Sequence, residues 1–201
     1  MNSYKRNIGI IPLSTLAMLF SQLAGAAEEA GGFDQVFELQ GISFHVLCPN
    51  QGSINQLEII PAGLEIDNAV IKREIDGTVT GAEVADLNGD GSPEIYTYIH
   101  SAGSGSYGSL VAYAANNKKS LSEITLPPLM DDKENSRGYM GHDEFAVVES
   151  YLVRRFPVYV KGDTNASPTG GTRQLQYRLK QGEASWVLEP GKSINYYQRE
   201  P

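Results

Sequence analysis

The stretch that decides the fold runs from residue 94 to residue 114, EIYTYIHSAGSGSYGSLVAYA. Its two ends, Glu94–His100 and Leu110–Ala114, are rich in β-branched and aromatic residues, which favours two strands. Between them, Ser101–Ser109 holds only Gly, Ser and Ala with one Tyr. A hairpin can turn with two residues. This longer connection therefore predicts either a functional loop or a mobile segment without a partner.

Similar strand signals extend along most of the chain. Short runs alternate apolar and polar residues with a period of two and are separated by turn residues, which is typical of strands. Asp76-Gly77 is a strong hairpin signal between two of these runs. Three sets of runs flank a turn signal and are predicted to pair, namely 36–39 with 42–48, 69–75 with 78–85, and 173–180 with 184–188. The runs 145–148 and 151–160 are also rich in Val, Tyr and Phe and are predicted to be strands. With the two strands around the Ser/Gly loop, roughly eight to ten strands predict an all-β protein, an antiparallel β-sandwich or a barrel-like fold.

The first residues have the pattern of a secretory signal peptide. Lys5 and Arg6 precede an apolar segment that runs from residue 8 to about residue 20, and Ala24-Gly25-Ala26 supplies a small-residue cleavage site. The apolar segment is too short and too interrupted for a membrane-spanning helix. We therefore expect a signal peptide over residues 1–26, cleaved near Ala26, and a single β-domain over residues 27–201.

The chain is acidic, with a formal net charge of −8. Removal of residues 1–26 takes away Lys5 and Arg6 and no acidic residue, so the charge becomes −10. This charge argues against nucleic acid and against anionic membrane surfaces as partners, and it favours a basic partner or solubility alone. The one cysteine, Cys48, cannot form an internal disulfide and is expected to be buried as a small apolar residue. The oligomeric state, a homodimer included, is left open.

An acidic segment, Asp86–Glu94 (DLNGDGSPE), resembles the start of a calcium-binding loop with Asp86, Asn88 and Asp90 at alternate positions. The position of the bidentate Glu in an EF-hand is occupied by Thr97, and no flanking helices are predicted. The favoured interpretation is a turn whose side chains bond their own backbone, with no metal and no cofactor. The alternative is a calcium-dependent extracytoplasmic binding module for sugar or protein.

Two sequence patterns that suggest enzymes are weak here. The glycines at 103, 105 and 108 match a dinucleotide fingerprint, but that motif requires a following helix and a strand follows instead. The residue types of a Ser/His/Asp triad are available at Ser104, His100 and Asp143, but no G-x-S-x-G turn is present. The sequence therefore predicts a protein that is not an enzyme, with an uncharacterised hydrolase as the weakest alternative.

The export signal, the acidic β-rich chain, the Asp86–Glu94 turn and the Ser104–Tyr107 segment between strands together resemble the family of periplasmic inhibitors of invertebrate-type (i-type) lysozyme. The resemblance implies a periplasmic protein that plugs the active-site cleft of an i-type lysozyme and protects the bacterial cell wall. It implies that Ser104 and Tyr107 enter the cleft. The rest of the expected lysozyme-binding site consists of Gly103, Gly105, Ser106 and Gly108. The candidates for the rim of the site are Arg137, Tyr139 and His142.

The chemistry of the loop fits this expectation independently. Glycosidases of this type work with one protonated and one ionised carboxyl group. A neutral hydroxyl can donate to a carboxylate and accept from a carboxylic acid, so Ser104 and Tyr107 suit both states. Glycines let the backbone approach another surface closely, and a Tyr ring is typical of interface hot spots.

Overall fold

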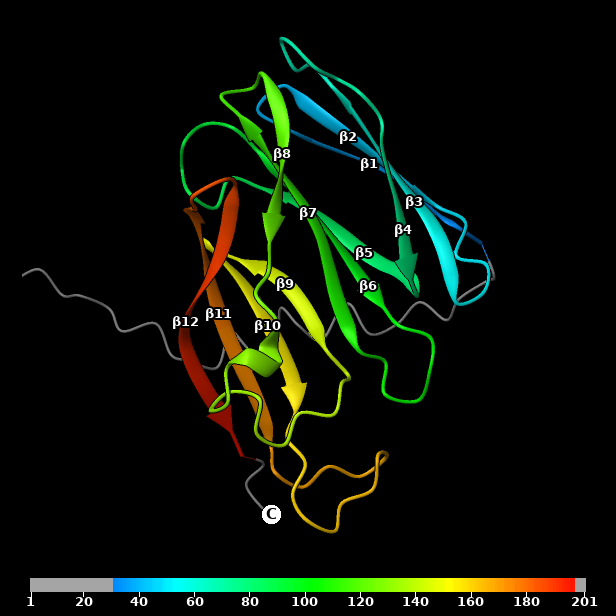
Figure 1. Cartoon of the computed structure of the whole chain (residues 1–201), viewed down its shortest axis with the longest axis vertical. Coiled ribbons are helices and arrows are strands. Elements are labelled where there is room, and N and C mark those ends of the chain that lie inside the picture. Colours follow the sequence, from blue (N-terminus) through cyan, green and yellow to red (C-terminus); the bar gives the residue numbers. More distant parts are fainter. Residues whose placement is uncertain (1–30, 198–201) are drawn as a thin grey trace, which may run out of the picture. The chain divides into compact units, whose positions relative to one another are not determined.

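In a computed structural model the protein is described over residues 31–197, and the expected signal peptide and its cleavage site near Ala26 lie outside the described residues. Within that range there are twelve strands, one 3-10 helix (η2, Leu129–Asp131) and no α-helix (Figure 1). The all-β prediction is confirmed, with twelve strands in place of eight to ten. No helix in the described part of the chain is long and apolar enough to span a membrane.

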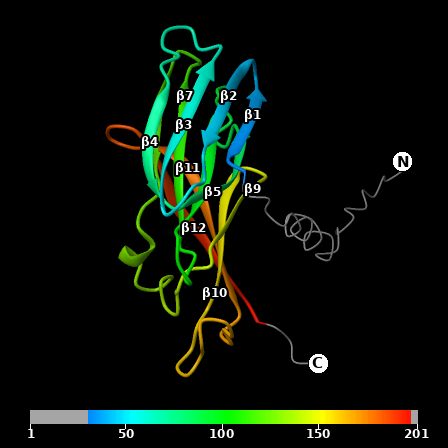
Figure 2. The ribbon, with the colours of Figure 1, turned by 90° about the vertical axis from the view of Figure 1, so that its right-hand side faces the viewer.

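The strands form two sheets. The first has the order β1-β2-β3-β4, and all of its pairs are antiparallel. Its strands are β1 (Phe33–Leu39), β2 (Ile42–Cys48), β3 (Ile54–Ala62) and β4 (Ile71–Asp76). Figures 1 and 2 show this sheet beside β5–β7, at one end of the larger sheet.

The second sheet has the order β5-β6-β7-β8-β12-β11-β10-β9. Its pairs are antiparallel except that β12 runs parallel to β8. This sheet is barrel-like and nearly closed. Its strands are β5 (Thr78–Ala85), β6 (Glu94–His100), β7 (Gly108–Asn116), β8 (Ser120–Thr125), β9 (Glu144–Val148), β10 (Tyr151–Pro157), β11 (Thr172–Gln181) and β12 (Trp186–Tyr196).

The expected hairpin at Asp76-Gly77 is wrong. The strands on its two sides, β4 and β5, pair with β3 and β6 and lie in different sheets. Gly77 has a φ of 124°, and a Cβ at this position would lie 2.0 Å from the backbone oxygen of His100. The Gly77 amide donates to Ser53, and its carbonyl accepts from the Asn55 side chain. Gly77 therefore allows the tight turn by which the chain passes from the first sheet to the second. A turn signal in the local sequence does not distinguish such a connection from a hairpin.

Two strands and part of a third were not predicted. β3 includes Pro61, and β12 continues through Pro190 and Gly191, residues that normally interrupt strands. Pro61 lies next to the end of β3, and Pro190 pairs with Tyr177 beside a register shift in the ladder. Both prolines therefore occur where regular pairing is already ending or irregular. The polar, Ser-rich β8 gives little alternation to detect.

Strand β6 connects two apolar cores. Ile95 and Ile99 belong to a cluster formed with the first sheet, whereas Tyr96 and Tyr98 belong to a cluster inside the second sheet. Because successive side chains of a strand point to opposite faces, this one strand contributes to both cores, and all of its residues except His100 are buried. The expected burial of Cys48 is confirmed. Leu175, Tyr177 and Leu179 on β11 are also buried, and Trp186 packs against the second cluster.

Candidate binding site

The Ser/Gly loop connects β6 to β7, as the sequence predicts. Pairing of the two strands ends at His100 and Gly108, so the loop comprises Ser101–Tyr107. Within it the Ser106 amide donates to the Gly103 oxygen at 3.1 Å, and the Ser101 amide donates to the Tyr107 oxygen at 2.9 Å. The Tyr107 amide in turn donates to Ser101 Oγ at 3.0 Å. The loop therefore has a defined internal hydrogen-bonding pattern.

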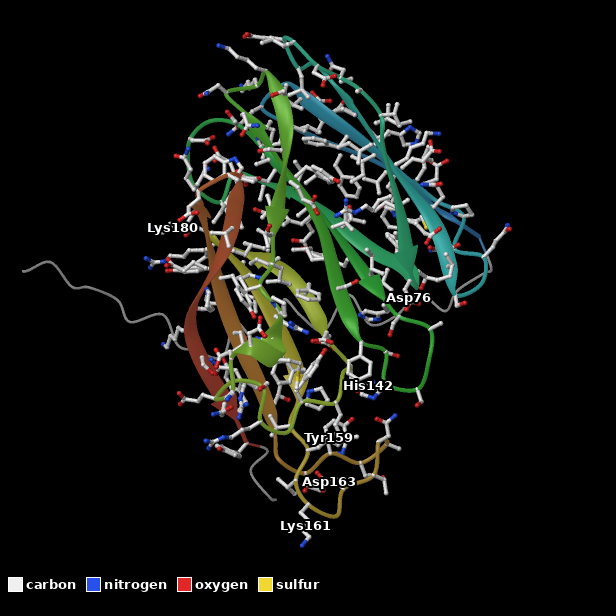
Figure 3. All side chains as sticks on the ribbon, in the orientation of Figure 1. Asp76, His142, Tyr159, Lys161, Asp163 and Lys180 are labelled. Atoms are coloured by element: carbon white, nitrogen blue, oxygen red, sulfur yellow. The ribbon has the colours of Figure 1, made fainter. Side chains whose placement is uncertain are left out.

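Neighbouring segments also hold the loop. The His142 amide donates to the Gly105 oxygen at 2.7 Å, and Asn165 Nδ2 donates to the Ser104 oxygen at 2.6 Å. His142 and Asn165 contact each other as well. Figure 3 shows His142 beside this loop, with Tyr159 and Asp163 on the segment that follows β10. Residues far apart in the sequence thus meet at one end of β6.

Tyr107 is half exposed, with 49% of the residue accessible to solvent, and one side of its ring packs against Tyr139. It meets the Tyr139 ring edge to face, with centroids 5.7 Å apart. A Cβ on Gly105 would lie 2.5 Å from Cε2 of this ring, and a Cβ on Gly141 would lie 2.0 Å from the Gly105 oxygen. Both glycines are therefore needed for the close packing that orients Tyr107.

A buried ion pair lies beneath the loop. Arg154 Nε donates to Asp143 Oδ1 at 2.6 Å, and Tyr139 donates its hydroxyl to Asp143 Oδ2 at 2.6 Å. The same Asp143 oxygen accepts the Gly108 amide at 2.7 Å. Burial, followed by the hydrogen bond to Asp143, raises the pKa of Tyr139, so its hydroxyl remains protonated and able to donate. One carboxylate thus holds the end of the loop and the ring that supports Tyr107.

A family model overlaps this region. The model described as periplasmic lysozyme inhibitor of I-type lysozyme matches residues 64–136. The family is PliI. The resemblance noted from the sequence is confirmed over that stretch, which contains both the Ser101–Tyr107 loop and the Asp86–Glu94 turn. The PliI match ends before Tyr139, Asp143 and Arg154. No curated protein and no solved structure matches the chain.

The six loop residues expected to bind lysozyme differ in their surroundings. Gly103, Ser104 and Tyr107 are exposed, whereas Gly105 and Ser106 are partly buried. Gly108 is the first residue of β7, and a Cβ there would lie 2.4 Å from Cβ of Asp143. The exposed groups available to a partner are therefore concentrated on Gly103, Ser104 and Tyr107.

The three residues considered for the rim also differ in exposure. Arg137 is exposed, and His142 is partly buried beside the loop. Tyr139 is partly buried between Tyr107 and Phe156, and its ring centroid is 4.9 Å from that of Phe156. Tyr139 therefore supports the loop from below.

The triad considered from the sequence is not assembled. His100 Nε2 lies 2.7 Å from the backbone oxygen of Asp143, whereas the Asp143 carboxylate contacts Arg154, Tyr139 and the Gly108 amide. A carboxylate in such a triad must orient the histidine ring. Asp143 does not have that role here.

Arg154 and its support of the loop through Asp143 and Tyr139 were missed from the sequence. Leu152, Arg154 and Phe156 alternate along β10, and all three are buried. A charged residue on the apolar face of a strand requires a buried partner. The position of Arg154 on this apolar face could therefore have indicated a buried ion pair, although the sequence does not identify Asp143 as the partner.

Proposed function

We propose that this chain is a periplasmic inhibitor of i-type lysozyme that inserts its Ser101–Tyr107 loop into the active-site cleft of the enzyme. Such an inhibitor protects the bacterial cell wall and performs no catalysis. The observation that carries the proposal is the seating of Tyr107, half exposed and packed on Tyr139 in a loop that the PliI match includes.

The loop presents polar groups without charge. Its side chains offer hydroxyl groups and one aromatic ring, and its glycines leave the backbone accessible. A hydroxyl can satisfy either the protonated or the ionised carboxyl group of a glycosidase. A carboxylate on the loop would be repelled by the ionised group. The nearby Asp143 is fully buried and paired with Arg154, so its charge is compensated inside the protein.

The contacts beneath the loop favour tight binding. Ordering a flexible segment on association costs free energy, and a segment already held in its bound shape avoids much of that cost. The bonds from His142 to Gly105 and from Asn165 to Ser104 hold two consecutive backbone carbonyls at the tip of the loop. Both donors lie outside the loop, so they remain in place when the tip is covered.

The test is a cell-lysis assay with the processed protein and an i-type lysozyme. Tyr107→Ala removes the hot-spot ring and is expected to weaken inhibition by about 30-fold, equivalent to about 2 kcal/mol. Ser104→Ala leaves a partner carboxyl group unpaired and is expected to weaken inhibition by about tenfold. Ser109→Ala, an exposed hydroxyl on β7 outside the loop, is the matched control and should inhibit as the unchanged protein does.

Two outcomes would contradict the proposal at different levels. Absence of inhibition by the unchanged protein would reject the inhibitor function. Full inhibition by the folded double variant Ser104→Ala, Tyr107→Ala would retain that function and reject the loop as the plug. Parallel assays with chicken-type and goose-type lysozymes measure the preference for the i-type enzyme.

A further inference from the structure

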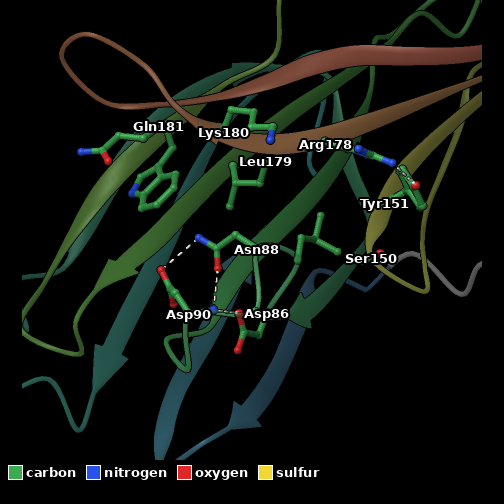
Figure 4. A pocket seen from close by; sticks show the side chains of 12 residues that line it. Asp86, Asn88, Asp90, Ser150, Tyr151, Arg178, Leu179, Lys180 and Gln181 are labelled. Carbon is green, nitrogen blue, oxygen red and sulfur yellow. Dashed lines mark hydrogen bonds between the residues drawn. The ribbon is translucent and has the colours of Figure 1, made fainter.

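The turn Asp86–Glu94, between β5 and β6, has the local hydrogen bonds expected of a turn rich in Asp and Asn. The Asp90 amide donates to Asp86 Oδ1 and to Asn88 Oδ1, each at 3.0 Å. Figure 4 shows Asp86, Asn88 and Asp90 gathered on one side of this turn. These bonds explain the shape of the backbone, but they leave one acidic group unexplained.

That group is Glu94, the first residue of β6. Its side chain is almost completely buried, with 1% of the residue exposed. Oε2 accepts the Leu87 amide at 2.8 Å, whereas Oε1 is buried without a hydrogen-bond partner among the described residues. A buried carboxylate oxygen without a partner is costly and rarely occurs without a reason.

Glu94 is directed toward the acidic turn. One carboxylate oxygen from each of Asp86, Asp90 and Glu94 lies within 4.8 Å of the other two. Oxygens that bind one Ca²⁺ at 2.3–2.6 Å can lie at most about 4.6–5.2 Å apart. The spacing of the three groups therefore matches a shared calcium ion. Burial, followed by the charges of Asp86 and Asp90, raises the pKa of Glu94 to about 8, as expected for carboxyl groups that converge without a counter-charge.

We propose that Asp86, Asp90 and Glu94 bind a calcium ion, with the side-chain oxygen of Asn88 as a further ligand. All of these ligands are hard oxygen atoms, which favour Ca²⁺ or Mg²⁺ over zinc or copper. An irregular turn with carboxylates suits the flexible coordination of Ca²⁺ better than the strict octahedron of Mg²⁺. The sequence favoured a turn without metal because Thr97 occupies the EF-hand position of the bidentate Glu and no flanking helices are predicted. The structure brings Glu94 to that role.

The proposed site is accessible and lies between the two sheets. Asp90 is exposed and lines a groove of about 650 Å³, together with Trp186 and Lys180 (Figure 4). Asp86 Oδ2 also accepts Gln40 Nε2, from the turn between β1 and β2, at 2.8 Å. A bound ion would therefore hold the β5–β6 turn where it contacts the first sheet. We expect its effect to be on stability.

The site does not depend on the proposed inhibitor function. Glu94 begins β6, whereas the Ser101–Tyr107 loop follows the last residue of the same strand. Loss of calcium and loss of lysozyme binding are therefore separable in experiments on single residues.

The test begins with the processed protein, stripped with a chelator and titrated with Ca²⁺ or Mg²⁺. We expect the Tm to rise continuously with calcium concentration by mass action, and to rise less with magnesium. Tb³⁺ provides a direct readout, because Tyr96 OH lies 3.4 Å from Glu94 Oε2 and its ring can sensitise the luminescence of a lanthanide in the site. Calcium should displace Tb³⁺ and remove that signal.

Three variants decide the assignment. Glu94→Gln and the exposed Asp90→Asn should each weaken calcium binding by about tenfold or more, since each removes a charged ligand. Asp67→Asn removes the same charge from an exposed turn outside the cluster and should keep the full response. An unchanged Tm with calcium, together with no sensitised Tb³⁺ signal, would overturn the proposal. So would a full calcium response in folded Asp90→Asn.

Discussion

Arg154 and Asp143 form an ion pair with Nε 2.6 Å from Oδ1, and the two residues are only 5% and 0% exposed. The pair lies between β10 and the segment before β9, beneath the Ser/Gly loop. Oδ2 of the same carboxylate accepts from Gly108, the residue that follows the loop, and from Tyr139, whose ring packs against Tyr107. These contacts connect the interior of the second sheet to the loop. A buried charge pair therefore supports the uncharged loop that we propose as the lysozyme-binding surface.

Replacement of Asp143 tests this connection. Asp143→Asn leaves the guanidinium of Arg154 buried without its counter-charge, and loss of one partner of a buried pair costs about 3–5 kcal/mol. We expect a lower free energy of unfolding in denaturant titrations and faster amide hydrogen exchange over residues 101–108. Inhibition of lysozyme should weaken even where the variant is folded. Asp34→Asn, which breaks the exposed contact of Asp34 with His45, should cost less than about 1 kcal/mol.

Gly141 provides a more local test of loop position. Its φ is 91°, and a Cβ would lie 2.0 Å from the Gly105 oxygen, so Gly141→Ala must displace the loop backbone. We expect a clear loss of inhibition, with the β-sheet circular dichroism spectrum retained. Gly162→Ala is the matched control, because Gly162 has a φ of 104° and no atom lies within 4 Å of the added carbon. Equal inhibition by the two variants would show that the contact between Gly141 and Gly105 does not position the loop.

Local pattern was sufficient for much of the fold. β6 has a bounded run of β-branched and aromatic residues, and its predicted and observed limits agree at Glu94 and His100. The pairing of β4 and β5 could not be deduced in the same way. After Gly77 the chain enters the second sheet, where the backbone of Gly77 lies close to that of His100. His100 is distant from Gly77 in the sequence, so local pattern does not reveal this contact.

The candidate site also contains residues that the sequence could identify and residues that it could not. Ser104 and Tyr107 stand out in the sequence because they lie in a long loop of small residues. The support from Asp143 and Arg154 could not be assigned, because the partner of a buried charge is chosen by the tertiary fold. Glu94 was overlooked as a ligand for a similar reason, since its burial beside Asp86 follows from the packing of β6.

Salt should alter the association rate with a basic lysozyme. The formal charge of −8, or −10 without residues 1–26, attracts a basic partner over long range. Salt screens this attraction over about 8 Å at physiological ionic strength. We expect the association rate to fall as salt rises and the dissociation rate to change little, because the loop is uncharged. Surface plasmon resonance at several salt concentrations separates the two rates, and an association rate independent of salt would contradict electrostatic steering.

The two edge strands of the second sheet meet through Glu83. The Val147 amide of β9 donates to Glu83 Oε2 of β5 at 2.6 Å, so a side chain closes the gap that backbone pairing leaves open. Burial raises the pKa of Glu83 above its ordinary value of 4.5. Below about pH 4.5 both the folded and the unfolded chain keep this proton, and as pH rises the unfolded chain loses it first. Ionisation of Glu83 therefore lowers the free energy of unfolding from about pH 4.5 up to its raised pKa.

Glu83→Gln should remove that loss while an amide oxygen still accepts the Val147 amide. We expect the variant to become progressively more stable than the unchanged protein as pH rises above about 4.5, as measured by denaturant unfolding at a series of pH values. Glu74→Gln removes the same charge from the exposed face of β4 and is the matched control. A difference between Glu83→Gln and the unchanged protein that stays constant from about pH 4 to about pH 8 would mean that the Glu83 proton is not coupled to folding. The closure between β5 and β9 would then owe its stability to packing and to the hydrogen bond alone.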